Sequence, residues 1–359
     1  LLELPSGFIL CPEPDAFLLA QRIVRDSGQD RRILGRFVKT LPALKRAALP
    51  RKDPTGLEEG LRLLFDRYQE KLRILGMLDL DDLEVETLRL FLEHPETAGA
   101  CGRQYPFVFV DEYQDTNPTQ VEILKALVFH GREAQKTAVS PNGDGSSPPG
   151  SGICAIGDPD QAVYGFRGAD VRKFYAFGQD FPGGREVVLL DNYRSTQRIL
   201  KGAAALMERP RALQGHNGPG DPILLAPCRT PEQEAEMIVE QIEKSLGGTT
   251  HFSLDSGRVA SHEDGENLSF GDIAVLFRLN AQCDALEEAF SRSGIPYARS
   301  GERPIISRYP VNVLWRFLQA VQYPGNPYYR ETYLGLSEMR GRGAEEILAG
   351  WNEGGPLRD

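Results

Sequence analysis

Residues 107–120 read FVFVDEYQDTNPTQ, and this stretch decides the fold class. The apolar run Phe107–Val110 is typical of a strand buried on both faces of a parallel sheet. Asn117 is a residue type that caps helices, and Pro118 suits a first helical position, so a helix is expected to follow at once. Its apolar stripe consists of Val121, Leu124, Leu127 and Val128. A buried strand followed directly by an amphipathic helix predicts an α/β fold.

The rest of the chain extends this pattern. Residues 1–100 have apolar side chains at three- and four-residue spacing and predict helices, with no strong strand before residue 105. Further helices are expected at 235–242, at 284–293 and from about 310. Short apolar runs predict strands at 153–156, 187–190, 223–225, 273–277 and 295–298. Residues 131–152 are rich in Gly, Ser and Pro and predict a flexible insertion. We therefore expect mostly parallel sheets with helical additions at both ends.

Composition excludes several classes of protein. Of the 359 residues 41% are hydrophobic, and the net charge of −10 means that any nucleic-acid binding depends on local sites. The five cysteines lack a C-x-x-C spacing, which excludes a zinc ribbon and argues against a disulfide scaffold. No apolar stretch has the length of a membrane span. A reducing cytoplasm is the expected compartment.

Polar side chains follow three successive predicted strands. They are Asp111-Glu112, then Asp158, then Asn192-Tyr193-Arg194. In open parallel sheets ligands bind at the carboxyl ends of strands. One carboxylate there can hold Mg²⁺ and a second can activate a water. From the dipeptide Asp111-Glu112 alone, the start of a helix turn is the favoured interpretation.

Three longer segments identify a family. They are VFVDEYQDTNPTQ (108–120), AIGDPDQAVYGFRGAD (155–170) and LLDNYRSTQRIL (189–200), and each resembles a signature of UvrD/Rep-like superfamily 1 helicases. The acidic segment LDLDDLE (78–84) and residues 271–302 are also similar to this family. The resemblance covers most of residues 60–320. It implies incomplete RecA-like P-loop NTPase sheets with helical insertions, ATP and Mg²⁺ as cofactors, single-stranded and duplex DNA as partners, and 3′-to-5′ movement.

The resemblance also implies roles for individual residues. It makes Asp111 the magnesium-holding aspartate and Glu112 the catalytic glutamate, with Arg194 an arginine that reaches the γ-phosphate in catalysis. The resemblance also implies three nucleotide-binding residues. Gln161 would sense the γ-phosphate, Tyr193 would lie against the base, and Arg194 would contact the nucleotide as well. The remaining implied residues couple the motifs (Gln114 and Asp115) or contact DNA (Tyr164, Phe166 and Arg167). Without the motif, ordinary packing would be the favoured interpretation for each of Tyr164, Phe166 and Phe174. Arg194 would also suit a structural ion pair.

One family motif is missing from these residues. No G-x-x-x-x-G-K-[ST] phosphate loop occurs in the sequence. We therefore expect an internal segment of a helicase that does not hydrolyse ATP by itself. The expected parts are a helical insertion of the first motor domain (1–100), the second half of that domain (101–190), part of the second motor domain (191–305) and the start of its helical insertion (306–359). Two alternatives remain: a degenerate DNA- or partner-binding module without hydrolysis, and the motor part of a helicase–nuclease.

Overall fold

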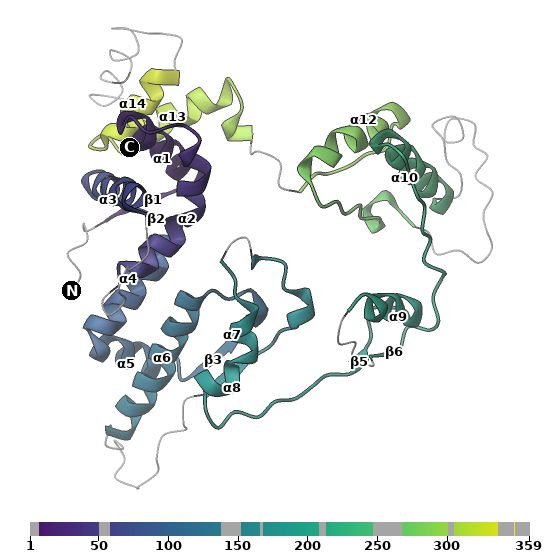
Figure 1. Ribbon diagram of the computed structural model, residues 1–359, viewed down its shortest axis with the longest axis horizontal. Helices are drawn as coiled ribbons and strands as arrows, with labels where there is room; N and C mark the ends of the chain where they lie inside the picture. Colours follow the sequence, from purple (N-terminus) through teal and green to yellow (C-terminus); the bar gives the residue numbers. More distant parts are fainter. Residues whose placement is uncertain are drawn as a thin grey trace, which may run out of the picture. The chain divides into compact units, whose positions relative to one another are not determined.

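The computed structural model describes residues 7–49, 58–137, 152–165, 168–207, 213–246, 268–300, 305–336 and 348. It divides into two compact units (Figure 1). The first comprises Leu1–Leu189 together with Val313–Asp359, and the second comprises Leu190–Asn312. Each unit is described by itself.

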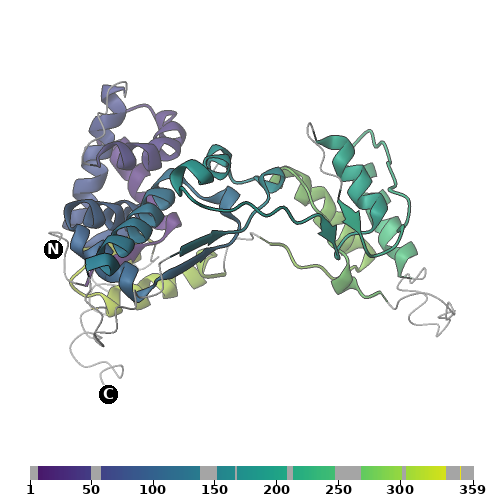
Figure 2. The same ribbon diagram turned by 90° about the horizontal axis from the view of Figure 1, so that it is seen from below.

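The first unit is mostly helical. Its helices are α1 (Glu13–Asp26), α2 (Ile33–Ala47), α3 (Glu59–Ile74), α4 (Leu80–Glu93), α5 (Pro95–Gln104), α6 (Pro118–Thr137), α7 (Val171–Tyr175), α8 (Phe177–Asp180), α13 (Val311–Gln322, which begins two residues before the unit boundary) and α14 (Pro327–Leu336). Its strands form two parallel pairs, β1 (Ile9–Cys11) with β2 (Met77–Asp79) and β3 (Phe107–Val110) with β4 (Gly152–Ala155). Figure 2 shows β3 and β4 side by side.

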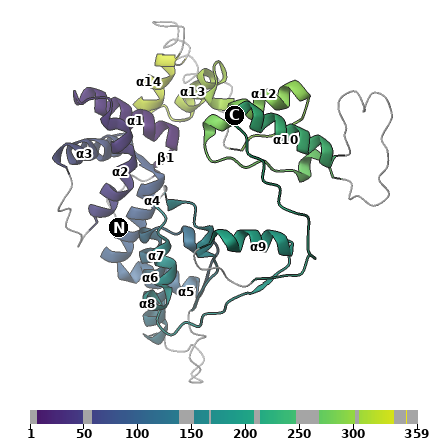
Figure 3. The ribbon, with the colours of Figure 1, turned by 45° about the vertical axis from the view of Figure 1, so that its right-hand side comes forward.

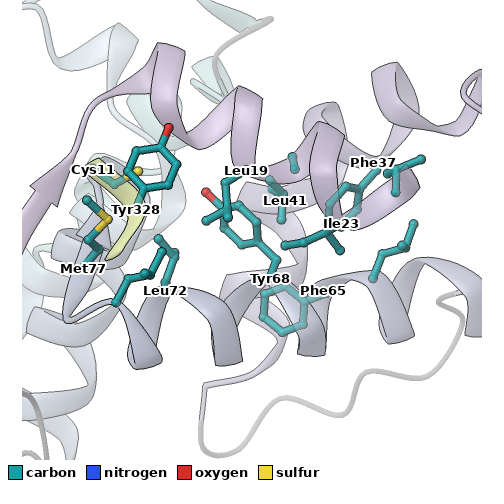
Figure 4. Close-up of a cluster of buried hydrophobic side chains, with 14 of the residues drawn as sticks. Cys11, Leu19, Ile23, Phe37, Leu41, Phe65, Tyr68, Leu72, Met77 and Tyr328 are labelled. Atoms are coloured by element: carbon teal, nitrogen blue, oxygen red, sulfur yellow. The ribbon is translucent and has the colours of Figure 1, made fainter. Parts of the chain in front are cut away.

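The main hydrophobic core joins the two ends of the first unit. Residues of α1, α2 and α3 pack with Tyr328, Tyr329 and Tyr333 of α14 (Figure 4). The Arg316 Nη1 atom of α13 donates to the Asp15 carboxylate of α1 at 2.9 Å, and both side chains are largely buried. Figures 1 and 3 both show α14 lying beside α1. Helices from residues 13–74 and 311–336 therefore share one core.

A buried ion cluster lies where α2 meets α4. Lys45 is 1% exposed and contacts the carboxylates of both Asp79 and Asp82, the latter at 2.7 Å. Tyr68 donates to Asp79 at 2.8 Å, and Asp79 and Asp82 also form the capping box that begins α4. Burial raises the pKa of Asp82, and the neighbouring Asp79 raises it further, while Lys45 opposes the shift. One cation thus holds two carboxylates and so fixes α2 against the start of α4.

The connection from α5 to α6 relies on two glycines in close contact. A Cβ atom on Gly102 would lie 2.5 Å from the Leu127 carbonyl oxygen and 2.6 Å from the Gly131 Cα. A larger residue would push the helices apart. These helices carry the chain into and away from β3, so their close packing fixes the strand whose end carries Asp111.

The second unit is built around α10 (Pro231–Ser245) and α12 (Cys283–Ser293). Their facing sides, together with Ile295 just after α12, form a separate core; the helical members are Ala235, Val239, Ile242, Leu286, Ala289 and Phe290. A short parallel pair, β5 (Asp191–Asn192) and β6 (Gln214–Gly215), flanks α9 (Gln197–Leu206) in sequence. Together the two units confirm the predicted α/β class with parallel strands and helical insertions.

Several predicted strands are wrong. The runs 187–190, 223–225, 273–277 and 295–298 form no strand, and Leu189, Leu225 and Leu276 are 78%, 86% and 93% exposed. A strand requires a partner that hydrogen-bonds to it along its length. Among the described residues, the run 187–190 receives one such bond, from the Gln214 N–H to the Leu190 carbonyl at 2.9 Å, where the β5–β6 pair begins. The strand β3 does pair with β4, but it is not buried on both faces, since Phe109 is 74% exposed.

Two further expectations need correction. Residues 131–137 of the predicted flexible insertion are helical and complete α6, while 138–151 lie outside the described residues. The three-residue pair β1–β2 was not expected at all, because three residues are too few to show a periodicity. Within the described ranges, none of the helices has both the length and the apolar character needed to cross a bilayer. All five cysteines are free thiols.

Candidate functional site

The end of β3 places two carboxylates next to each other in an unusual backbone conformation. Glu112 has φ 50° and ψ 45°, and among the described residues it is the one non-glycine with positive φ. This left-handed conformation costs a non-glycine residue about 1–3 kcal/mol and is concentrated at functional sites. The Glu112 N–H donates to Asp111 Oδ1 at 3.0 Å, and both side chains are exposed. No residue type in this segment signals the strained turn.

Gln114 connects the ends of β3 and β4. It is 1% exposed, and its Nε2 donates to Glu112 Oε2 at 2.6 Å. Its Oε1 accepts the backbone N–H of Asp158 at 2.9 Å. A Cβ atom on Gly157 would lie 2.4 Å from that Oε1, so the glycine is required for Gln114 to reach Asp158. The Glu112 carboxylate is therefore oriented from the neighbouring strand's end.

Asp158 extends this connection to Gln161. Its Oδ2 accepts the Gln161 Nε2 at 2.9 Å within the short 3₁₀ turn Pro159–Gln161. The result is a hydrogen-bonded series that runs Glu112, Gln114, Asp158, Gln161. All four were singled out from the sequence, Asp158 as the polar end of the second strand and the other three as site residues, and the structure brings them together.

A hollow of about 460 Å³ lies beside this series. Asp111, Glu112 and Asp115 line it from the strand end, and Gln120, Ile123 and Leu124 line it from α6. Tyr113 anchors the turn beneath it, because its ring packs edge-on against Phe177 at 5.3 Å. Burial, with a contribution from Asp180, raises the pKa of Tyr113 to about 12, so the phenol stays neutral. The turn that carries the carboxylates is thus packed against an aromatic residue of α8.

The start of α6 agrees with its prediction in detail. Asn117 Oδ1 accepts the backbone N–H groups of Thr119 and Gln120 at 2.8 and 3.0 Å, and Pro118 is the first helical residue. The Asn117 and Gln120 side chains also donate to Glu84 of α4 at 2.7 Å each. These bonds fix the wall of the hollow against the helical part of the unit.

Tyr193 and Arg194 lie in the second unit, directly after β5. Asn192 Oδ1 accepts the backbone N–H groups of Arg194 and Ser195 at 3.0 and 2.7 Å, and so shapes the turn. Tyr193 is 71% exposed, and its ring stacks on His216 at 4.6 Å with an interplanar angle of 14°. Within the described part of the chain Arg194 makes no ion pair, so the structural ion pair is not observed there.

Comparison with known proteins decides the family. The model of the UvrD/REP helicase N-terminal domain matches residues 38–182, and that of the UvrD-like helicase C-terminal domain matches residues 187–325. The chain belongs to the UvrD/Rep-like superfamily 1 helicases. It is 31% identical to the ATP-dependent DNA helicase UvrD1 of Mycobacterium tuberculosis over 339 residues, which are 90% of this chain and 40% of that protein.

Two further relatives agree. UvrD1 of Mycobacterium leprae is 30% identical over 338 residues, covering 90% of this chain and 40% of that protein. The ATP-dependent DNA helicase PcrA of Staphylococcus epidermidis is 32% identical over 263 residues, covering 72% of this chain and 31% of that protein. The chain therefore spans about 40% of the length of the UvrD1 helicases that it matches.

The UvrD/Rep-like resemblance raises the question of whether the strand end suits Mg²⁺. Within the described ranges no three side chains of metal-binding type gather in one place. Mg²⁺ does not require such a group, because it usually keeps several waters and uses one or two carboxylates beside substrate phosphates. The exposed pair Asp111 and Glu112 fits that donor set.

Other predicted site residues of this UvrD/Rep-like chain have different outcomes. Tyr164 is 42% exposed and follows Gln161 by three residues. Phe166 and Arg167 lie outside the described residues, so their roles stay predictions. His216 was not predicted as a site residue, because a lone histidine in a polar loop carries no motif. Lys45, whose partners Asp79 and Asp82 lie in the acidic segment 78–84, was not predicted either.

Proposed function

We propose that the gene product containing these 359 residues is an ATP-dependent DNA helicase that moves 3′ to 5′ along single-stranded DNA. The observation that carries the proposal is the hydrogen-bonded series Glu112–Gln114–Asp158–Gln161 in a chain of the UvrD/Rep-like family. It joins a carboxylate suited to hydrolysis to a residue suited to sensing phosphate. The named relatives are ATP-dependent DNA helicases, which supports the same function.

In the proposed reaction a water attacks the γ-phosphorus of ATP and the bond to the ADP oxygen breaks. Glu112 orients this water and takes its proton. Gln114 donates to Oε2 of Glu112 and so leaves Oε1 for the water. Asp111 is the residue that would hold Mg²⁺, which supplies positive charge to the phosphates when bound. The two neighbouring carboxylates thereby serve two different roles.

Further residues are proposed to contact the nucleotide. Gln161 reads the γ-phosphate, and Arg194 adds a planar fork of donors that matches phosphate oxygens. Tyr193 stacks on the base with its exposed face. The carbonyl groups of Tyr193 and Arg194 each accept a hydrogen bond from the Asn217 side-chain amide at 2.8 Å. Asn217 therefore stabilises the turn that carries both residues.

The proposed coupling to DNA follows the same hydrogen bonds. Tyr164, Phe166 and Arg167 contact single-stranded DNA, and aromatic side chains suit stacking on bases of any sequence. A shift of this segment moves Gln161, and through Asp158 and Gln114 it reorients Glu112. Asp115 lines the hollow beside Glu112 and takes part in this coupling. DNA occupancy thereby changes the rate of hydrolysis.

The test is ATP hydrolysis and duplex unwinding by the purified gene product. We expect hydrolysis that requires Mg²⁺ and rises with single-stranded DNA, and unwinding of duplexes with a 3′ tail but not a 5′ tail. DNA binding without hydrolysis would instead support the degenerate binding module. Degradation of the strands would support a helicase–nuclease, and absence of both DNA binding and hydrolysis would contradict the proposal.

A further inference from the structure

The short sheet of the second unit places two aromatic rings face to face, one directly after each strand. β5 and β6 pair in parallel, with Asp191 opposite Gln214 and Asn192 opposite Gly215. Tyr193 is the first residue after β5, and His216 is the first after β6. Their rings are nearly parallel, with centroids 4.6 Å apart and 14° between the planes.

His216 is held in this position from two sides. Its backbone N–H donates to the Asn192 carbonyl at 2.9 Å, which continues the strand pairing. Its Nε2 lies 2.8 Å from Asp191 Oδ1, and because a carboxylate only accepts, the imidazole donates this bond. The ring therefore has a fixed plane under Tyr193 and a fixed tautomer.

The stack affects only one face of Tyr193. The residue remains 71% exposed although His216 covers one side of its ring, so the opposite face is open to solvent. An unsupported exposed tyrosine samples several rotamers, and fixing such a side chain on binding costs conformational entropy. Because His216 already holds the Tyr193 ring flat, much of this cost is incurred before any ligand binds.

We propose that His216, oriented by Asp191, is a positioning residue that holds the Tyr193 ring flat so that its open face stacks on the nucleobase of the bound nucleotide. The inference rests on the proposed function, in which Tyr193 contacts the base. The ligand class is a nucleoside triphosphate, and His216 acts on the base and not on the phosphates. It therefore contributes to affinity for ATP but not for tripolyphosphate, which has no base.

Two measurements on the gene product test this inference. The first is NMR of the His216 ring protons without nucleotide, where the Tyr193 ring current should shift them upfield and Tyr193→Leu should abolish the shift. The second is the ratio of the dissociation constants of tripolyphosphate and ATP. His216→Ala should lower this ratio about two- to tenfold, which corresponds to the worth of an aromatic pair. The constant for tripolyphosphate should stay unchanged.

Two further variants separate positioning from a general structural role. His216→Phe keeps a flat ring and should restore most of the ratio. Gln214→Ala, an exposed neighbour on β6, is the matched control and should leave the ratio unchanged. A lower affinity for both ligands in His216→Ala would show a merely structural role and overturn the inference.

The remaining outcomes distinguish the two proposals. An unchanged ratio in His216→Ala, or no ring-current shift, overturns the role of His216 while Tyr193 keeps its own. An unchanged ratio in Tyr193→Leu shows that the base does not stack on Tyr193, which overturns both this inference and the nucleotide contact under it. Absence of ATP binding by the unmodified protein has the same consequence.

Discussion

Replacing Lys45 with methionine should destabilise the first unit strongly. The ammonium is 1% exposed, and the side chains of Asp79 and Asp82, which it contacts, are 9% and 4% exposed. Methionine keeps the volume of the side chain but leaves two buried carboxylates without their cation. Removing one partner of a buried ion pair typically costs about 3–5 kcal/mol. For a unit of this size each kcal/mol lowers the melting temperature by about 2–4 °C, so a fall of roughly 6–20 °C is expected.

The loss of stability in Lys45→Met should depend on pH. Burial raises the pKa of Asp82, so folding favours its protonated form. The stability from this group is therefore fully present below the ordinary carboxyl range and is lost as pH rises through the raised pKa. Without Lys45 the pKa rises further, because the group that opposes the shift is gone. The loss of stability in Lys45→Met should therefore be smaller at about pH 5 than at about pH 8.

The assay is denaturant unfolding followed by circular dichroism at both pH values. Lys39→Met is the matched control, since Lys39 is exposed on the same helix and such changes stay within about 0.5 kcal/mol. The combined variant Lys45→Met, Asp79→Asn, Asp82→Asn removes the uncompensated charges and should regain part of the stability. A Lys45→Met protein as stable as the control at about pH 8 would refute the reasoning.

Three further predictions concern single positions. Gly102→Ala should destabilise the first unit by about 1–3 kcal/mol, because the added methyl group has no room. Gly60→Ala on α3 has no neighbour within 4 Å and should stabilise the unit slightly, and thermal unfolding of both variants measures the difference. Gln114→Ala should abolish the stimulation of ATP hydrolysis by DNA while ATP still binds, and an unchanged stimulation factor would contradict the coupling series. Arg194→Ala should weaken the preference for ATP over ADP in a binding titration. Arg194→Lys should restore this preference only in part, since lysine lacks the planar fork of donors. An unchanged preference in Arg194→Ala would show that Arg194 does not contact the γ-phosphate.

Local signals in the sequence predicted much of the structure. The cap at Asn117, the proline after it and the apolar stripe of α6 all depend on residues within a few positions of one another, and the helix begins where they indicate. The strand Phe107–Val110 is present for the same reason. The order of the family segments then led to the family itself, because long motifs carry more information than single residues.

Features that depend on distant residues were not predictable. The apolar runs at 187–190 and 273–277 have the composition of strands, yet pairing requires a neighbour that composition does not specify. Lys45 reads as one more charge on a helix, and its burial becomes evident only when residues 34 and 37 positions away meet it. His216 likewise gains its partner Tyr193 through the pairing of β5 with β6. The left-handed backbone of Glu112 leaves no trace in the residue type.

The most direct test of the account is ATP hydrolysis by the gene product carrying Glu112→Gln, measured beside ATP binding in the presence of Mg²⁺ and single-stranded DNA. The change keeps the size of the side chain but removes the charge that takes the proton from water. We predict that binding survives and that hydrolysis falls by about a hundred- to ten-thousand-fold, as for loss of a general base. Glu122→Gln on α6, whose side chain is 41% exposed, should keep the unmodified rate. Hydrolysis by Glu112→Gln at that same rate would contradict the account, because Glu112 would then only begin a turn.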